Sequence, residues 1–213
     1  MNAFNELATV GLAGVTAFLV TAFITPLVRV VAIRGGWVAK PAEDRWGHRT
    51  TARLGGIAMF VGFLVAVLCW IPLQAPVRAM LVAAALVVAL GFIDDLHRIR
   101  PYTKLIGQLL IGCLVVFSGI RIELINWPWL AIPLSVFWFV FMMNAFNLLD
   151  NMDGLAAGVG AIAAVFCAIH AALAQQWLIV SLDGVLCGVC LGFLLSNFTP
   201  AKIYMGDAGS HFL

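Results

Sequence analysis

The chain has 213 residues, of which 63% are hydrophobic and 10% are charged, and its formal net charge is +2. An average soluble domain has roughly 25% charged residues, so the composition excludes a disordered protein and most water-soluble proteins of this size. A bilayer core about 30 Å thick needs about 20 apolar residues in a helix. The uncharged stretches Leu54–Val77, Leu124–Leu149 and Gly154–Leu182 meet that length and predict a polytopic membrane protein.

Seven complete spans are predicted in chain order, which makes the chain an all-α, polytopic transmembrane helical bundle. A short extended or hairpin segment is expected at Arg121–Trp127, between the fourth and fifth spans. After the turn Phe198–Gly209, the chain starts an eighth helix and reaches Leu213. The predicted spans are Leu7–Val30, Leu54–Pro72, Val77–Ile93, Leu105–Gly119, Trp129–Phe146, Leu155–Ala174 and Trp177–Asn197.

Basic residues predict the orientation of these spans, because cytoplasmic loops of membrane proteins are enriched in Lys and Arg. Of the 12 basic residues, only Arg78 and Arg121 fall on one side of the predicted spans. The other side is therefore expected to be cytoplasmic, with the N-terminus outside. It carries Arg29, Arg34, Lys40, Arg45, Arg49, Arg53, Arg98, Arg100, Lys104 and Lys202.

Five acidic residues gather in three turns on the predicted cytoplasmic side: Asp94, Asp95, Asp150, Asp153 and Asp207. Capping of a helix end is a sufficient explanation for each of them taken singly. It explains the group poorly, because Asp94 and Asp95 follow the third span, at the end where the helix dipole opposes negative charge. Adjacent carboxylates also repel each other unless a cation or a proton shares their site.

Hard divalent cations prefer carboxylate and carbonyl oxygens as ligands. Basic side chains that suit phosphate oxygens, those of Arg49, Arg53 and Lys104, lie among the acids. The sequence therefore predicts Mg²⁺, with Mn²⁺ as the alternative metal, and an anionic phosphate substrate at the cytoplasmic membrane surface. The small net charge gives no reason to expect a nucleic acid as a partner.

Four motifs with these residues occur in order along the chain. In chain order they are HRTTARLGG at His48–Gly56, GFIDD at Gly91–Asp95, NAFNLLDNMDGL at Asn144–Leu155 and MGDAGS at Met205–Ser210. Together they resemble the signatures of the polyprenyl-phosphate N-acetylhexosamine-1-phosphate transferases, the glycosyltransferase family 4 enzymes. One departure is that the family's usual Thr-Pro in the HRTTARLGG loop is Thr51-Ala52 here.

The resemblance implies a Mg²⁺-dependent enzyme that moves a sugar-1-phosphate from a UDP-sugar to undecaprenyl or another polyprenyl phosphate and releases UMP. The chain is more similar to the bacterial UDP-N-acetylglucosamine enzymes that initiate cell-envelope glycans than to the translocase for the muramoyl-pentapeptide nucleotide. By this resemblance Asp94 and Asp95 are catalytic, and Asp207 and Asn147 are metal ligands. The substrate-binding set is Lys104, Asp150, Asp153, His48, Arg49 and Arg53.

Such an enzyme is expected in the bacterial inner membrane, with its active face in the cytoplasm. Whether it forms a homodimer stays open. Members of the family usually continue through further helices and a later cytoplasmic loop. Residues 1–213 are therefore expected to be one transmembrane domain, a C-terminally truncated portion of a longer enzyme. Two other readings stay open: an ion-coupled membrane transporter, and an inactive membrane fragment of the transferase.

Overall fold

The computed structural model describes residues 3–39 and 51–213 of the chain. Within this part the chain forms eight helices and one pair of two-residue strands. The strands β1 (Val38–Ala39) and β2 (Thr51–Ala52) are antiparallel, with Val38 opposite Ala52. The helices are α1 (Ala3–Arg34), α2 (Gly55–Trp70), α3 (Ala75–His97), α4 (Pro101–Phe117), α5 (Pro128–Leu149), α6 (Leu155–Leu173), α7 (Trp177–Asn197) and α8 (Gly206–Phe212).

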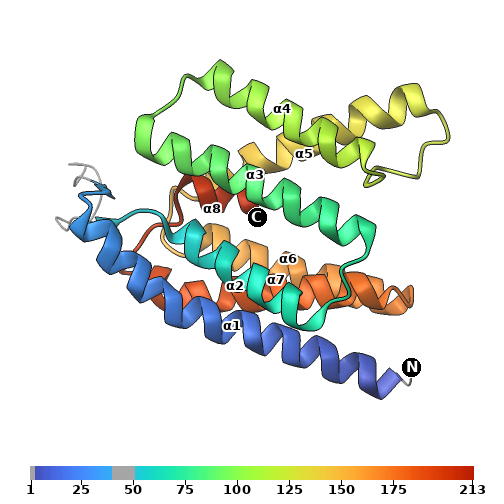
Figure 1. Cartoon of the computed structure of the whole chain (residues 1–213), viewed down its shortest axis with the longest axis horizontal. Helices are drawn as coiled ribbons and strands as arrows, with labels where there is room; N and C mark the ends of the chain where they lie inside the picture. The colour runs from blue at the N-terminus through green and yellow to red at the C-terminus, as the bar shows by residue number, and fades with distance from the viewer. Residues whose placement is uncertain (1–2, 40–50) are drawn as a thin grey trace.

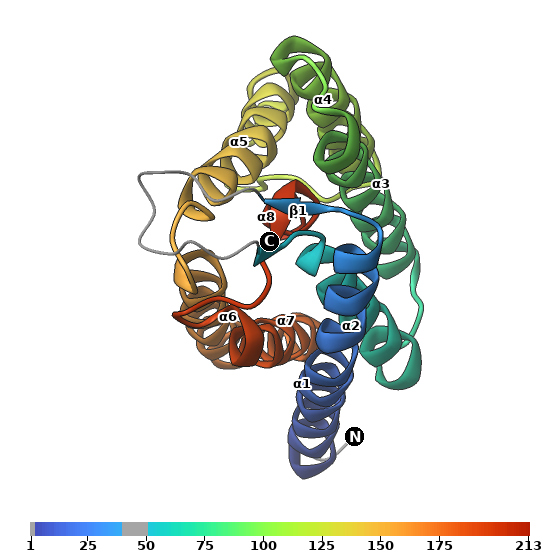
Figure 2. The ribbon, with the colours of Figure 1, turned by 90° about the vertical axis from the view of Figure 1, so that its left-hand side faces the viewer.

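The long helices form two groups with the short helix α8 between them (Figure 1). In one group α7 packs against α1, α2 and α6, and in the other α4 packs against α3 and α5. The end-on view places α8 in the middle of the bundle (Figure 2), where it contacts α2, α3 and α5. The residues of α8 are thus enclosed by helices from both groups, and Ala208, Gly209 and Ser210 are buried.

The all-α membrane fold expected from the sequence is confirmed. In the described part of the chain, five helices are long and apolar enough to cross a bilayer: α1, α3, α5, α6 and α7. The apolar helices α2 and α4 match the second and fourth predicted spans but are only 16 and 17 residues long. The count of seven complete spans therefore stays a prediction, as does the orientation.

Of the extended or hairpin segment expected at Arg121–Trp127, the hairpin alternative is wrong. No strand forms in this part of the described chain, and an irregular segment connects α4 to α5. Leu124 and Trp127 are 95% and 62% exposed, so this segment lacks the buried apolar face that would stabilise a hairpin.

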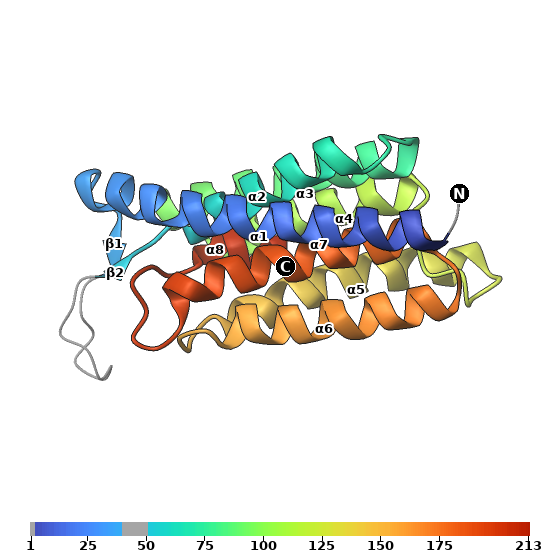
Figure 3. The ribbon, with the colours of Figure 1, turned by 90° about the horizontal axis from the view of Figure 1, so that it is seen from below.

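Successive long helices run in alternating directions, so that one end of the bundle collects the residues of most interest. The C-terminal ends of α1, α3, α5 and α7 lie at the same end as β1 and β2, opposite the N-terminus (Figures 1 and 3). Helices α2, α4, α6 and α8 begin there. The three turns that carry the predicted Asp cluster therefore share one end of the molecule.

Two glycines allow α8 to approach its neighbours closely. A Cβ atom on Gly91 of α3 would lie 2.4 Å from the carbonyl oxygen of Asp207, and one on Gly56 of α2 would lie 2.0 Å from the nitrogen of Gly209. These are main-chain atoms, which cannot move away by a change of rotamer. Gly56 and Gly91 thus set the distance between α8 and the two helices on either side of it.

Gly91→Ala is expected to destabilise the protein, because the new methyl group forces α3 and α8 apart. Overpacking of this kind costs about 1–3 kcal/mol. Gly158→Ala in α6 is the matched control, since a Cβ atom there meets nothing within 4 Å. Thermal unfolding in detergent is the measurement, and equal melting temperatures for the two variants would contradict the close approach at Gly91.

Candidate active site

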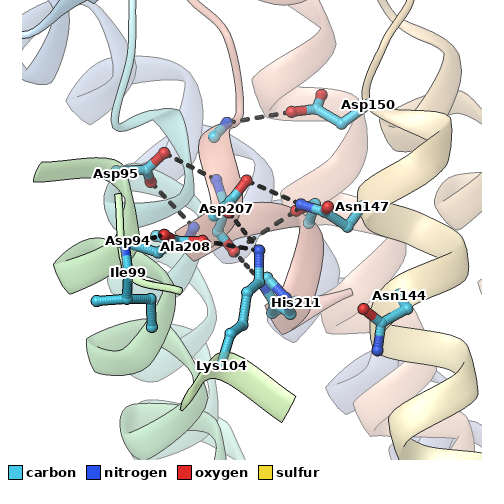
Figure 4. Close-up of polar contacts among 12 residues, drawn as sticks. Asp94, Asp95, Ile99, Lys104, Asn144, Asn147, Asp150, Asp207, Ala208 and His211 are labelled. Atoms are coloured by element: carbon cyan, nitrogen blue, oxygen red, sulfur yellow. Dashed lines mark hydrogen bonds and ion pairs between the residues drawn. The ribbon is translucent and has the colours of Figure 1, made fainter. Parts of the chain in front are cut away.

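Two carboxylates hold the beginning of α8. Both oxygens of Asp95 accept main-chain hydrogen bonds, Oδ1 from the N–H of Asp207 at 3.0 Å and Oδ2 from the N–H of Ala208 at 3.1 Å. From the other side, Asp150 Oδ2 accepts the N–H of Gly206 at 3.2 Å (Figure 4). Exposed N–H groups and the helix dipole make a helix N-terminus favourable for negative charge. Asp95 lies in the last turn of α3, but its carboxylate binds main-chain N–H groups at the start of α8. This contact explains why an acidic residue occurs at that position.

The carboxylate of Asp207 is the centre of a polar cluster built from four helices. Lys104 of α4 pairs with Asp207 and, at 2.8 Å, with Asp94 Oδ2 of α3. Asn147 of α5 donates from Nδ2 to Asp207 Oδ1 at 2.8 Å and to Ser210 Oγ at 3.0 Å. One ammonium group between two carboxylates offsets the repulsion that their proximity would otherwise cause.

The surroundings of Asp207 favour its ionised form. Burial raises the pKa of this carboxyl group, but hydrogen bonding with Asp94 and Lys104, the Lys104 charge and the Asn147 amide outweigh burial. The pKa of Asp207 therefore lies below its usual range. A carboxylate kept ionised and 30% exposed at its side chain is suited to bind a cation.

A cavity of about 190 Å³ opens beside this cluster. Five residues that the sequence singled out line it together: Arg53, Asp95, Asn147, Asp150 and Asp207. Three further residues complete the lining: Asn151, Tyr204 and Gly206. The cavity is referred to below as the Asp207 pocket.

Some predicted site residues lie elsewhere. Asp153 is not among the residues that line the Asp207 pocket, and its Oδ2 accepts the main-chain N–H of Ala201 at 2.9 Å. Asp94 and Lys104 join the cluster through Asp207 rather than through the lining. His48 and Arg49 lie outside the described residues.

Sequence reasoning missed two uncharged side chains. Ser210 is fully buried and accepts a hydrogen bond from Asn147. Asn197, at the end of α7, is 2% exposed; its amide accepts the N–H of Gly154 and donates to the carbonyl of Ile203. Each had a weak signal, because Ser210 lies within the MGDAGS motif and Asn197 is a polar residue at the end of an apolar helix.

The donors of the cluster suit Mg²⁺ bound with a phosphate. Among the described residues, no group of three or more His, Cys, Asp and Glu side chains stands ready to hold a metal. Mg²⁺ usually binds proteins through one or two carboxylates and takes its other ligands from water and substrate phosphates. Asp207, with the amide oxygen of Asn147 as a second donor, fits that pattern.

The chain is similar in sequence to known proteins. The sequence profile described as glycosyl transferase family 4 matches residues 77–213, which include nearly all of α3, the whole of α4 to α8 and most of the polar cluster. The chain belongs to glycosyl transferase family 4. This family is the one that the four motifs resembled.

Curated relatives of this family member carry related names. A "probable undecaprenyl-phosphate N-acetylglucosaminyl 1-phosphate transferase" of Bacillus subtilis is 36% identical over 209 residues, which cover 93% of the chain and 58% of the relative. A "decaprenyl-phosphate N-acetylglucosaminephosphotransferase" of Mycolicibacterium smegmatis is 37% identical, over 97% of the chain and 57% of the relative. A "phospho-N-acetylmuramoyl-pentapeptide-transferase" of Desulforudis audaxviator is 36% identical, over 91% of the chain and 70% of the relative. The chain thus spans less than three fifths of the length of the first two.

Proposed function

We propose that this family member transfers N-acetylglucosamine-1-phosphate, or a related N-acetylhexosamine-1-phosphate, from a UDP-sugar to undecaprenyl or another polyprenyl phosphate. UMP is released, and the lipid-linked product initiates a cell-envelope glycan. One observation carries the proposal: Asp207 contacts Lys104, Asn147 and the Asp95 carboxylate of α3, so that three separate motifs meet at one pocket. The names of the relatives support the sugar phosphate and the lipid acceptor.

The charges of the site supply the contacts that two phosphorylated substrates need. The diphosphate of the UDP-sugar enters the Asp207 pocket, where Arg53 and the amide of Asn151 offer donors. The lipid phosphate approaches Lys104 from the membrane, since α4 places this ammonium group at the start of an apolar helix. Asp153 and the neighbouring turn are expected to lie near the uridine.

The transfer itself is a displacement at phosphorus. An oxygen of the lipid phosphate attacks the sugar-bearing phosphorus, the bond from that phosphorus to the bridging oxygen breaks, and UMP leaves with the electron pair. Asp94 orients or deprotonates the lipid phosphate, and Lys104 offsets the negative charge that gathers in the transition state.

Mg²⁺ held by Asp207 and Asn147, when bound, neutralises the diphosphate and stabilises the leaving phosphate. The chain's own contribution is to place the ligands. Asp95 anchors the main chain at Asp207, and Ser210 accepts from Asn147 and so orients its amide. These contacts fix both donors before substrate arrives.

The position of the cluster favours an enzyme over an ion-coupled transporter. Transporters place ionisable residues near the middle of the membrane, whereas Asp94 lies near the end of α3 and Asp207 at the start of α8. A lipid head group also lies at the membrane surface. We therefore propose an inner-membrane protein with this end of the bundle in the cytoplasm.

Direct assay of the reaction tests the proposed function. Membranes that carry this protein are incubated with labelled UDP-N-acetylglucosamine, Mg²⁺ and undecaprenyl phosphate. A labelled lipid that appears only when all three are present is the expected product, and stoichiometric UMP is the second readout. Absence of both products in protein that is folded and membrane-inserted would reject the proposal and revive the inactive-fragment reading.

Cysteine labelling of intact cells tests the orientation. Leu124→Cys is expected to react with a membrane-impermeant maleimide from outside, because Leu124 is 95% exposed in the link between α4 and α5. Met152→Cys, 66% exposed between α5 and α6, is expected to react only after the cells are opened. The unsubstituted chain gives the background of its native cysteines. The reverse pattern would place the polar cluster outside the cytoplasm.

A further inference from the structure

The segment that joins α7 to α8 is held by side and main chains from several parts of the bundle. This segment, Phe198–Met205, forms one wall of the Asp207 pocket through Tyr204 and leads directly to Asp207. Its contacts include Asp153 Oδ2 with the N–H of Ala201 at 2.9 Å, Arg29 Nε with the carbonyl of Lys202 at 3.1 Å, Asn197 Nδ2 with the carbonyl of Ile203 at 2.9 Å, and the carbonyl of Ala52 with the N–H of Tyr204 at 2.8 Å.

Asn197 joins the two walls of the pocket through both polar atoms of its amide, whereas Asp153 joins them through a single bond to Ala201. While Nδ2 donates to Ile203 in the joining segment, Oδ1 accepts the N–H of Gly154 at 3.0 Å. Gly154 ends the turn whose residues Asn147 and Asp150 form the opposite wall. Both polar atoms of a side chain that is 2% exposed are therefore used to hold one wall to the other.

Two further bonds between the walls lie inside the pocket. Asn147 reaches Asp207, and Asp150 reaches the N–H of Gly206. These four residues line the pocket, so a bound diphosphate competes for the same donors and acceptors. Asn197 is not a lining residue, and its bonds lie behind the pocket, where a ligand leaves them intact.

We propose that Asn197 is a positioning residue that sets the width of the Asp207 pocket and thereby the affinity for the nucleotide sugar. The proposal rests on the proposed function, because that function places the diphosphate in this pocket. Asn197 acts through Asn147, Asp150 and Asp207 and touches no substrate. Losing a buried pair of hydrogen bonds lets the walls separate, which weakens contacts to a ligand that bridges them.

Separate Michaelis constants for the two substrates test this role. In Asn197→Ala, the KM for UDP-N-acetylglucosamine is expected to rise about tenfold, with the KM for undecaprenyl phosphate unchanged. Ser181→Ala is the matched control in the same helix, since the buried Ser181 hydroxyl bonds to the carbonyl of Trp177 one turn earlier. A residue that only maintains the fold would lower kcat and leave both constants unchanged, and that result would overturn the proposal.

Asn197→Asp gives a second variant that stays close to native shape. Its carboxylate still accepts from Gly154 but places an oxygen against the carbonyl of Ile203, so a raised KM is expected at neutral pH. Lowering the pH protonates the carboxyl group and restores a donor, so the KM is expected to return toward that of the unsubstituted protein. A KM ratio of variant to unsubstituted protein that does not change with pH would contradict this.

Calorimetry with UMP separates this proposal from the proposed function. If the unsubstituted protein makes no lipid-linked product, the proposed function fails. Weaker UMP binding by Asn197→Ala than by Ser181→Ala would then still support the role of Asn197. Equal UMP affinities in the two variants would overturn that role, whatever the turnover.

Discussion

Asp207→Asn is expected to abolish transfer while the protein remains folded and in the membrane. The substitution keeps the size of the side chain and removes the negative charge proposed to hold Mg²⁺. Loss of metal-borne stabilisation of the leaving phosphate costs several kcal/mol of barrier, so that turnover falls by roughly 10³-fold or more. The change also leaves Lys104 with Asp94 as its remaining ion-pair partner.

Metal binding gives a readout of this variant that needs no turnover. Mn²⁺ binding to the purified protein in the presence of UDP-N-acetylglucosamine, followed by electron paramagnetic resonance, is expected to weaken strongly in Asp207→Asn. Asp183→Asn is the control for loss of a carboxylate, because Asp183 lies in α7, away from the residues of the polar cluster. Near-normal turnover and Mn²⁺ affinity in Asp207→Asn would remove Asp207 from the metal site.

Asp94→Asn is expected to depress transfer by about 10²–10⁴-fold, the range typical for loss of a general base. The amide oxygen still accepts the N–H of Ile99, which Asp94 Oδ1 accepts at 2.9 Å in the native protein. The charge partner of Lys104 at 2.8 Å is lost. Nucleotide binding is expected to persist, because Asp94 is not among the residues that line the Asp207 pocket.

Asp95→Asn is the informative comparison, since the two neighbouring acids have different contacts. Both oxygens of Asp95 accept main-chain N–H groups of α8. In the Asn variant an NH₂ group replaces one of these oxygens, so two hydrogen-bond donors face each other there. We expect this variant to lose activity and also about 1–3 kcal/mol of unfolding free energy, because the hydrogen-bond pair is unsatisfied.

If Asp94→Asn instead loses UMP affinity in calorimetry, the division of roles between Asp94 and the pocket residues is wrong.

Much of the polar cluster could be predicted from sequence because its members are charged. Asp residues at the ends of apolar spans have few structural explanations, and alternation of the helices brings such ends together. The pairing of Lys104 with Asp94 and Asp207 follows the same logic of opposite charges. The number of Asp residues at one end of the spans, rather than any single Asp, indicated the site.

Contacts to the main chain could not be predicted in the same way. Asp95 and Asp153 accept N–H groups that lie 112 and 48 residues away, and every residue except proline offers the same N–H group. The sequence thus gave no reason to choose Ala201 as the partner of Asp153. Asn197 escaped notice for a related reason, since an uncharged side chain that bonds to main-chain atoms leaves no complementary residue to find.

The central place of α8 implies an order of assembly. The ends of α3 and α5 are synthesised about one hundred and about fifty residues before Gly206, yet the N–H groups that their acids accept belong to α8. Until the ribosome has released that helix, Asp95 and Asp150 face water or lipid head groups instead, and Gly56 and Gly91 border an unfilled space. The pocket therefore cannot form before α8 enters between the two helix groups.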